Sequence, residues 1–201
     1  MIIKYLILLL IFSTSSFSQD FSSGGSSSSS AGIKLPIEFL FCPLSYSETE
    51  TSSSSVSTFT GTGMIFRGGI SFGIIDILGN YETATQKNDM TVGGIFQNKE
   101  DTGFGGIIKF KYGRSFYLGA GYSILNSTIK NSGASTSVSK LSGKKMYALV
   151  GYNLNLFGSF KLFGEGTYII SGEYVSSDGV DFTNPILITG FSANVGIGLS
   201  F

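Results

Sequence analysis

The residue types needed for common enzyme chemistry are largely missing from this chain of 201 residues, which contains no histidine. A Ser-His-Asp or Cys-His catalytic site and a histidine-containing zinc site are therefore excluded. Residues 69–73 read Gly-Ile-Ser-Phe-Gly and match the Gly-x-Ser-x-Gly pattern of serine hydrolases. That pattern needs a strand-turn-helix elbow and a histidine base, so we interpret the match as coincidental.

The other reactive groups also favour structural explanations. Cys42 is the only cysteine, so it cannot form an intramolecular disulfide, and we expect a small packed side chain. Glu48 and Glu50 lie among serines and threonines without a basic neighbour, and we expect them to be solvated rather than to bind a cation. No phosphate-binding loop or cysteine metal spacing is present. The sequence predicts no catalytic residue, no metal and no cofactor.

The charge composition limits the possible partners. Lys and Arg number 13, Asp and Glu number 13, and charged residues make up 13% of the chain. Globular proteins typically have about 25%. Nucleic-acid binding depends on clustered positive charge, which a balanced chain of low charge does not supply. We therefore expect no nucleic-acid partner.

From residue 33 onward, apolar residues recur at every second position, which is typical of β-strands with one polar and one apolar face. In the last such stretch Ile197 and Leu199 alternate with Gly198 and Ser200. No comparable stretch has helical spacing. The sequence predicts an all-β fold of eight antiparallel strands in up-and-down order, at about 33–42, 64–72, 75–82, 104–112, 116–124, 145–156, 160–171 and 187–201.

The predicted connections alternate in length. Tight turns lie near Gly73, Gly113 and Gly158, whereas the segments 46–59, 83–101, 127–141 and 175–184 read as long polar loops. Short turns on one side and long loops on the other are typical of a transmembrane β-barrel of the outer membrane, with both termini periplasmic. The segment from Met90 to Phe96 either extends the third strand or forms a strand of its own.

Alternation alone does not decide which face of the barrel is outside, because a soluble lipocalin-like carrier would enclose its apolar face. Two bands of aromatic residues favour an apolar exterior in a membrane. One band lies beside the short turns and the other further along the strands, and together they comprise Phe72, Tyr112, Phe116, Phe160 and Phe201, then Tyr81, Tyr122 and Tyr168.

The polar face then lines the lumen, and an eight-stranded barrel is only wide enough for side chains to fill it. We expect its charged groups to neutralise one another there and to leave no wide channel. The predicted lumen charge network comprises Lys34, Glu38, Arg67, Asp76, Glu82, Lys109, Lys111, Lys145, Lys161 and Glu165, and the same alternation also assigns Glu173 to this face.

The first 32 residues have a different composition. Residues 1–18 carry Lys4, then an apolar run and small residues, which indicates a secretory signal peptide. Residues 19–32 are rich in Gly and Ser and predict a flexible leader, because they offer little apolar surface to bury. The barrel domain is therefore expected to span residues 33–201.

The carboxyl-terminal stretch carries a family resemblance. Val195, Ile197, Leu199 and Phe201 occupy alternate positions and end the chain on an aromatic residue. This resembles the C-terminal signal that the barrel-assembly machinery recognises in bacterial outer-membrane barrels. The chain resembles small barrels of the OmpX and OmpA-barrel kind, particularly those of Bacteroidota. The resemblance implies a Gram-negative outer membrane, contact with its lipid, and the barrel-assembly machinery as a partner during insertion.

The resemblance brings no named activity, so the expected function rests on what the sequence contains. We expect a non-enzymatic barrel with a structural or interaction role, including that of an accessory subunit in a larger envelope complex with a protein partner. The alternatives are a small pore for ions or small solutes and a soluble lipocalin-like carrier.

Overall fold

The computed structural model describes residues 33–52, 56–88, 96–113, 115–132, 137–157 and 159–201, and the predicted signal peptide and leader lie outside them. The strands are β1 (Ile33–Lys34), β2 (Pro36–Thr51), β3 (Val56–Phe72), β4 (Ile75–Asn88), β5 (Phe96–Tyr112), β6 (Phe116–Ser132), β7 (Ser137–Phe157), β8 (Phe160–Ser177) and β9 (Val180–Ser200). Among these residues no helix is long and apolar enough to cross a membrane.

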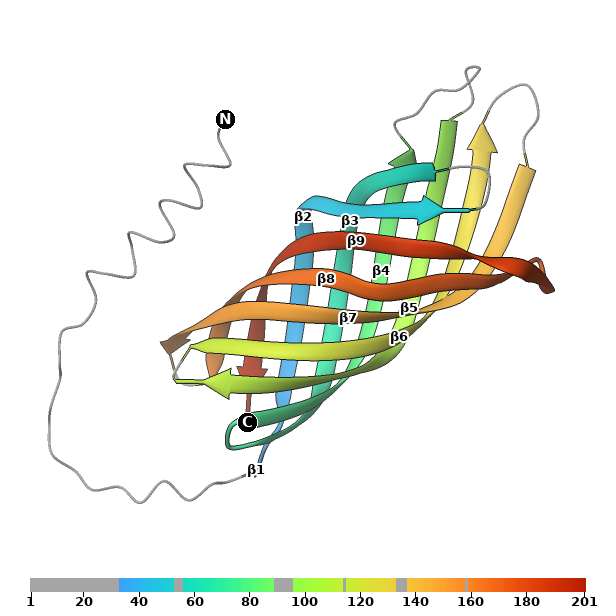
Figure 1. Ribbon diagram of the computed structural model, residues 1–201. Coiled ribbons are helices and arrows are strands. Elements are labelled where there is room, and N and C mark those ends of the chain that lie inside the picture. The colour runs from blue at the N-terminus through green and yellow to red at the C-terminus, as the bar shows by residue number, and fades with distance from the viewer. Residues whose placement is uncertain (1–32, 53–55, 89–95, 114, 133–136, 158) are drawn as a thin grey trace, which may run out of the picture. The chain divides into compact units, whose positions relative to one another are not determined.

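The strands close into one barrel (Figure 1). From β2 to β9 each strand pairs antiparallel with the next, and β2 also pairs with β9, from Pro36–Ser200 to Thr51–Leu187. The short β1 pairs with β3 in the register that β2 continues, so β1 and β2 form one interrupted strand. The predicted eight-stranded antiparallel up-and-down barrel is therefore confirmed.

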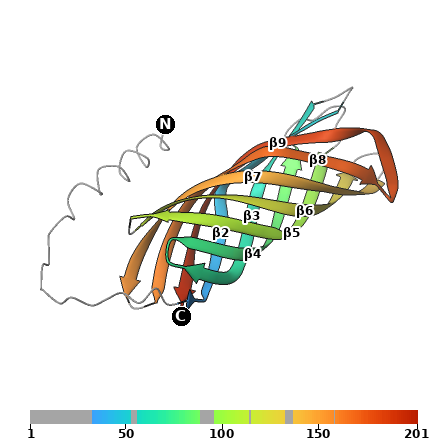
Figure 2. The same cartoon turned by 60° about the horizontal axis from the view of Figure 1, so that its bottom comes forward.

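One end of the barrel carries tight turns, and we call it the short-turn end. Gly73 and Gly113 adopt positive φ angles of 56° and 66° in the turns after β3 and β5, a conformation that glycine adopts readily. The last residue, Phe201, exchanges backbone hydrogen bonds with Leu35, and Figures 1 and 2 show the C-terminus at the same end as β1. The described chain thus begins and ends at the short-turn end.

The opposite end, which we call the hairpin end, differs from the sequence-based expectation of long polar loops. The strands continue well beyond the predicted boundaries, and β8 and β9 are joined by Asp178 and Gly179 alone. Both residues have positive φ angles, as in a two-residue hairpin turn. The expected loop at 175–184 is therefore a hairpin, because polar residues extend the sheet there. Phe96 begins β5, and the rest of the segment from Met90 lies outside the described residues.

Outward side chains form an apolar belt next to the short-turn end. On β5 the outward positions from Phe104 to Tyr112 are apolar or glycine, and these two aromatic side chains are 68% and 80% exposed. This stretch of nine positions matches the length of a tilted strand that crosses a bilayer, about 9–11 residues. Toward the hairpin end the outward side chains become polar, beginning with Thr102 on β5 and Thr83 on β4. The apolar face is outside, which is the reverse of a lipocalin-like carrier.

Neighbouring strands approach closely at inward-facing glycines. A Cβ atom added to Gly105 would lie 1.8 Å from the carbonyl oxygen of Tyr122 on β6, whereas one added to Gly106 would meet only the Leu78 carbonyl oxygen, at 3.7 Å. These adjacent glycines face opposite sides of the same strand, so they form a matched pair for substitution.

We expect Gly105→Ala to destabilise the folded barrel by about 1–3 kcal/mol, because the strands must separate to admit the methyl group. Gly106→Ala should have little effect, since its methyl group meets open space. Urea unfolding of the lipid-folded protein measures both. Equal unfolding midpoints for the two variants would contradict this account of the barrel wall.

Candidate functional site

Arg67 on β3 is the centre of a buried charge network inside the belt. Its Nη1 and Nη2 atoms donate to the two carboxylate oxygens of Glu165 on β8, each at 2.7 Å. Its Nε donates to Asn80 Oδ1 on β4 at 3.1 Å. A two-point arginine–carboxylate pair is both strong and directional, so it fixes the spacing of β3 and β8 across the lumen.

The remaining partners complete and neutralise this network. Glu38 on β2 lies 3.5 Å from Arg67 Nη1 and 2.5 Å from Lys109 Nζ on β5. The hydroxyl of Tyr117 on β6 donates to Glu165 at 2.9 Å, and Lys109 Nζ lies 4.5 Å from the centre of the Tyr117 ring. Two cations therefore face two carboxylates, and these groups come from five strands around the barrel.

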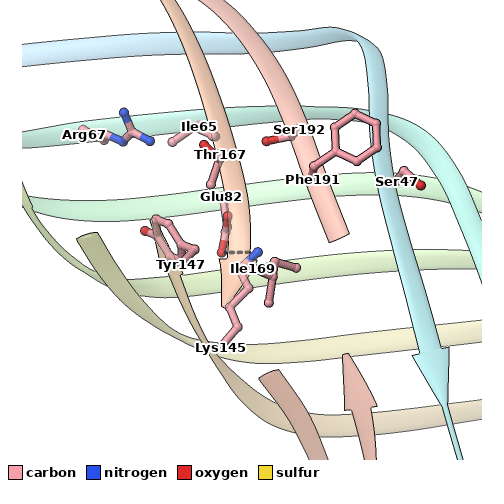
Figure 3. A pocket seen from close by; sticks show the side chains of 10 residues that line it. All are labelled: Ser47, Ile65, Arg67, Glu82, Lys145, Tyr147, Thr167, Ile169, Phe191 and Ser192. Carbon is pink, nitrogen blue, oxygen red and sulfur yellow. Dashed lines mark ion pairs between the residues drawn. The ribbon is translucent and has the colours of Figure 1, made fainter. Parts of the chain in front are cut away.

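Next to the network, an apolar layer and a charged pair fill the lumen. The layer consists of buried side chains from most of the strands: Leu40, Ile65, Ile107, Tyr117, Tyr147, Leu149 and Phe163. Lys145 Nζ lies 3.0 Å from Glu82 (Figure 3), beside a cavity of about 20 Å³ that Arg67 also lines. A volume of this size holds about one water molecule.

The short-turn end of the lumen is less balanced. Lys111 Nζ lies 2.7 Å from Asp76 and donates to Ser71, also at 2.7 Å. Lys161 is half-buried and has no carboxylate at ion-pair distance within the described strands, and Lys34 is exposed. Ser71 lies within β3 and not at a strand-to-helix elbow, so the hydrolase-like string has no catalytic geometry.

A second buried cluster lies at the hairpin end. Lys99 Nζ on β5 forms ion pairs with Glu48 and with Glu50, the latter at 2.7 Å, and lies 3.5 Å from Asp101. It also faces the rings of Phe59 and Tyr174, 5.1 Å and 4.9 Å from their centres. The expectation that Glu48 and Glu50 are solvated was wrong, because the extended β2 turns both carboxylates into the lumen.

The structure places the sequence-predicted lumen residues as follows. Six are buried inside the barrel: Glu38, Arg67, Asp76, Lys109, Lys145 and Glu165. Glu82 and Lys111 are half-buried in ion pairs, whereas Lys161 and Lys34 take no part in the printed pairs of the network.

Glu173 is a correction to the alternation. It lies on the outward face and pairs with Lys144 at 3.0 Å. The register between β8 and β9 shifts between Ile169 and Gly172, and this bulge reverses which residues face inward. Tyr174 faces the lumen in place of Glu173.

Other predicted residues can also be located. Cys42 is buried, as expected of a packed side chain. Val195, Ile197, Leu199 and Phe201 are all exposed on the outer surface of β9 and at its end, and their recognition by the assembly machinery stays a prediction. Within the described residues no group of His, Cys, Asp or Glu side chains could hold a metal ion.

Comparison with known proteins shows the fold and not a family. No family model and no curated protein matches the chain. Among solved structures, the outer membrane protein AlkL in DMPC bilayers has a TM-score of 0.55 at 15% identity, covering 91% of this chain and 97% of AlkL. Neisserial surface protein A has a TM-score of 0.50 at 16% identity, covering 84% and 97%.

The same architecture occurs in Ail, the attachment invasion locus protein of Yersinia pestis, solved in complex with the heparin analogue sucrose octasulfate. Its TM-score is 0.50 at 11% identity, covering 84% of this chain and 99% of Ail. The chain therefore has the fold of small outer-membrane β-barrels, and the resemblance seen in the sequence is confirmed at the level of fold.

We expect Arg67→Ala to lower the melting temperature of the detergent-folded barrel, because Glu165 and Glu38 lose their buried partner. Breaking a buried ion pair typically costs about 3–5 kcal/mol. Lys130→Ala is the control, since Lys130 pairs with Glu100 on the exposed surface, where such pairs contribute little. An unchanged melting temperature for Arg67→Ala would count against the network as a stabilising element.

Proposed function

We propose that this chain is an integral outer-membrane protein with a structural or interaction role, and that it neither transports solutes nor catalyses a reaction. The observation that supports this most directly is an outward apolar belt around a lumen filled by side chains. In this orientation the short-turn end faces the periplasm and the hairpin end faces the outside of the cell, as in other outer-membrane barrels.

Membrane insertion is supported by two physical features of the wall. Because β2 pairs with β9, the sheet has no open edge within the belt, and a bilayer cannot supply hydrogen bonds to unpaired backbone groups. Aromatic side chains lie at both margins of the belt, with Tyr112 and Phe116 near the turns and Tyr81, Tyr122 and Tyr168 on the other side. Amphipathic rings favour the two membrane interfaces.

A closed lumen argues against the pore alternative. The Arg67 network, the apolar layer and the Lys99 cluster follow one another along the barrel axis, and each draws side chains from several strands. The cavities between them, at about 10–20 Å³, hold about one water molecule each.

The absence of histidine supports a non-enzymatic role. The buried polar groups pair with one another: Arg67 with Glu165, Lys109 with Glu38, and Lys111 with Ser71. Side chains engaged in this way hold the barrel together and are not presented to a substrate.

The hairpin end is the surface we propose for interaction. The sheet extends past the belt there, and its outward side chains include exposed charges on three strands: Lys130 and Glu100, and Lys144 with its partner Glu173. Rigid frames that hold exposed segments commonly carry binding functions. An accessory subunit of a larger envelope complex is the specific form of this role.

We expect the purified protein to show no reproducible conductance steps in planar lipid bilayers, because its ion-pair and apolar layers block the lumen. A known porin inserted under the same conditions is the positive control. Discrete steps whose size changes in the Arg67→Ala variant would instead favour the pore.

We expect a stoichiometric protein partner to co-purify from native outer membranes in mild detergent. An affinity tag inserted between Asp178 and Gly179 would leave the sheet intact, since these residues form the turn between β8 and β9. Mass spectrometry gives the stoichiometry. A solitary barrel would contradict the accessory-subunit role and leave an autonomous structural role in the envelope.

A further inference from the structure

The Lys99 cluster joins strands from around the barrel, and we call Glu48, Glu50, Lys99 and Asp101 the carboxylate latch. Glu48 and Glu50 come from β2, and Lys99 and Asp101 come from β5, which β3 and β4 separate from β2. On β5 the apolar belt ends at Phe104, so the latch lies beyond the belt toward the hairpin end. It therefore crosses the lumen above the part that faces lipid.

The β2 strand is interrupted just before it reaches the latch. Its register shifts against β3 between Cys42 and Tyr46, and against β9 between Phe41 and Ser47. Figure 1 shows β2 changing direction sharply before it continues toward its end. The latch ties this redirected part of β2 to the far wall.

The charges in and around the latch do not balance. The cations are Lys99 and, toward the belt, Lys145, whereas the carboxylates are Glu48, Glu50, Asp101 and the Lys145 partner Glu82. With every group ionised, the cluster carries two more negative than positive charges. The other side chains that face it, Gln86, Ser127 and Tyr174, are neutral, and burial raises the pKa of the Tyr174 hydroxyl well above its ordinary value. The Arg67 network, in contrast, has equal numbers of both signs.

Two buried oxygen atoms in the latch also lack a hydrogen-bond donor. Gln86 Nε2 donates to one oxygen of Asp101, but the other oxygen, Oδ1, and Gln86 Oε1 have no partner among the described residues. Asp101 is 7% exposed and Gln86 is 0% exposed, so bulk water does not replace the missing donor. A buried acceptor without a donor is destabilising. A proton on Asp101 would convert Oδ1 into a donor and remove one of the excess charges.

We propose that the carboxylate latch is a proton-operated closure: it holds β2 across the lumen while Asp101 or Glu50 carries a proton, and it loosens when both ionise. The ligand of this site is the proton itself, taken up from the medium at the hairpin end. Closure thereby depends on the external pH.

The direction of the pH effect follows from the environment of the two acids. Burial raises the pKa of Asp101 to about 7, against the lowering effect of Lys99, and burial also raises the pKa of Glu50. A solvated aspartate has a pKa of about 3.9. A raised pKa means that the closed state binds the proton more tightly than the open state. Protonation therefore stabilises closure fully below about pH 4, and that contribution is lost as the pH rises through about 7.

The natural cysteine provides a reporter of opening. Cys42 is 1% exposed and lines the same small cavity as Asp101, directly beneath the latch. A charged, membrane-impermeant thiosulfonate should modify it only when the latch opens. Dividing the rate by that of the urea-unfolded chain at each pH removes the contribution of thiol ionisation. Linkage with the two pKa values predicts that the normalised rate rises about tenfold from pH 6 to pH 9.

Three variants of the full-length mature chain in detergent test the assignment. Asp101→Asn mimics the protonated acid and should give a low rate with little pH dependence, and Glu50→Gln should also reduce the slope. Glu100→Gln is the matched control, because Glu100 is the neighbouring residue on β5 but points outward to Lys130. It should keep the pH dependence of the unmodified protein.

The proposal fails if the unmodified protein shows a flat normalised rate from pH 6 to pH 9. It also fails if Asp101→Asn and Glu50→Gln both keep the original slope, or if Glu100→Gln abolishes the slope as fully as they do. The shift in gel mobility on heating shows which variants are folded, so either latch variant suffices if the other does not fold.

Discussion

The interior of this barrel is too narrow for bulk water, and that constraint governs which side chains can occupy it. Every inward polar group must find a partner across the lumen, because an unpaired buried charge is costly. Arg67 meets this requirement through Glu165, Glu38 and Asn80, which come from three different strands. The same contacts join opposite walls, so neutralisation and mechanical closure of the lumen are one arrangement.

The two charged layers of the lumen meet this constraint in different ways. The network around Arg67 lies within the belt and is neutral without any added ion or proton. The carboxylate latch lies beyond the belt and has an excess of acids around Lys99. Groups deep in the membrane are poorly placed to exchange protons with water, whereas those near the hairpin end are close to it. The position of each layer thus matches the kind of charge balance that it uses.

The sequence predicted the belt well and the hairpin end poorly, for physical reasons. Between Phe104 and Tyr112 one face meets the apolar exterior and the other the polar lumen, so alternation is strict and the strand is readable. Beyond the belt both faces are polar, and the strands there were taken for loops. The Lys99 cluster was missed because its carboxylates lie in β2, about 50 residues earlier, and no local pattern relates them. Glu173 was misassigned because a bulge reverses the alternation without leaving a mark in composition.

The seam between β2 and β9 has a consequence for the order of folding. It joins Pro36 to Ser200, nearly the full length of the described chain, whereas the other main strand pairs are neighbours in sequence. Contacts of long sequence separation form late, because the loop entropy is lost before they contribute. Glu38 lies on β2 and Glu165 on β8, so their shared contact with Arg67 assembles only when the seam closes. The barrel wall would therefore zip from hairpin to hairpin, and its charged interior would lock in the final step.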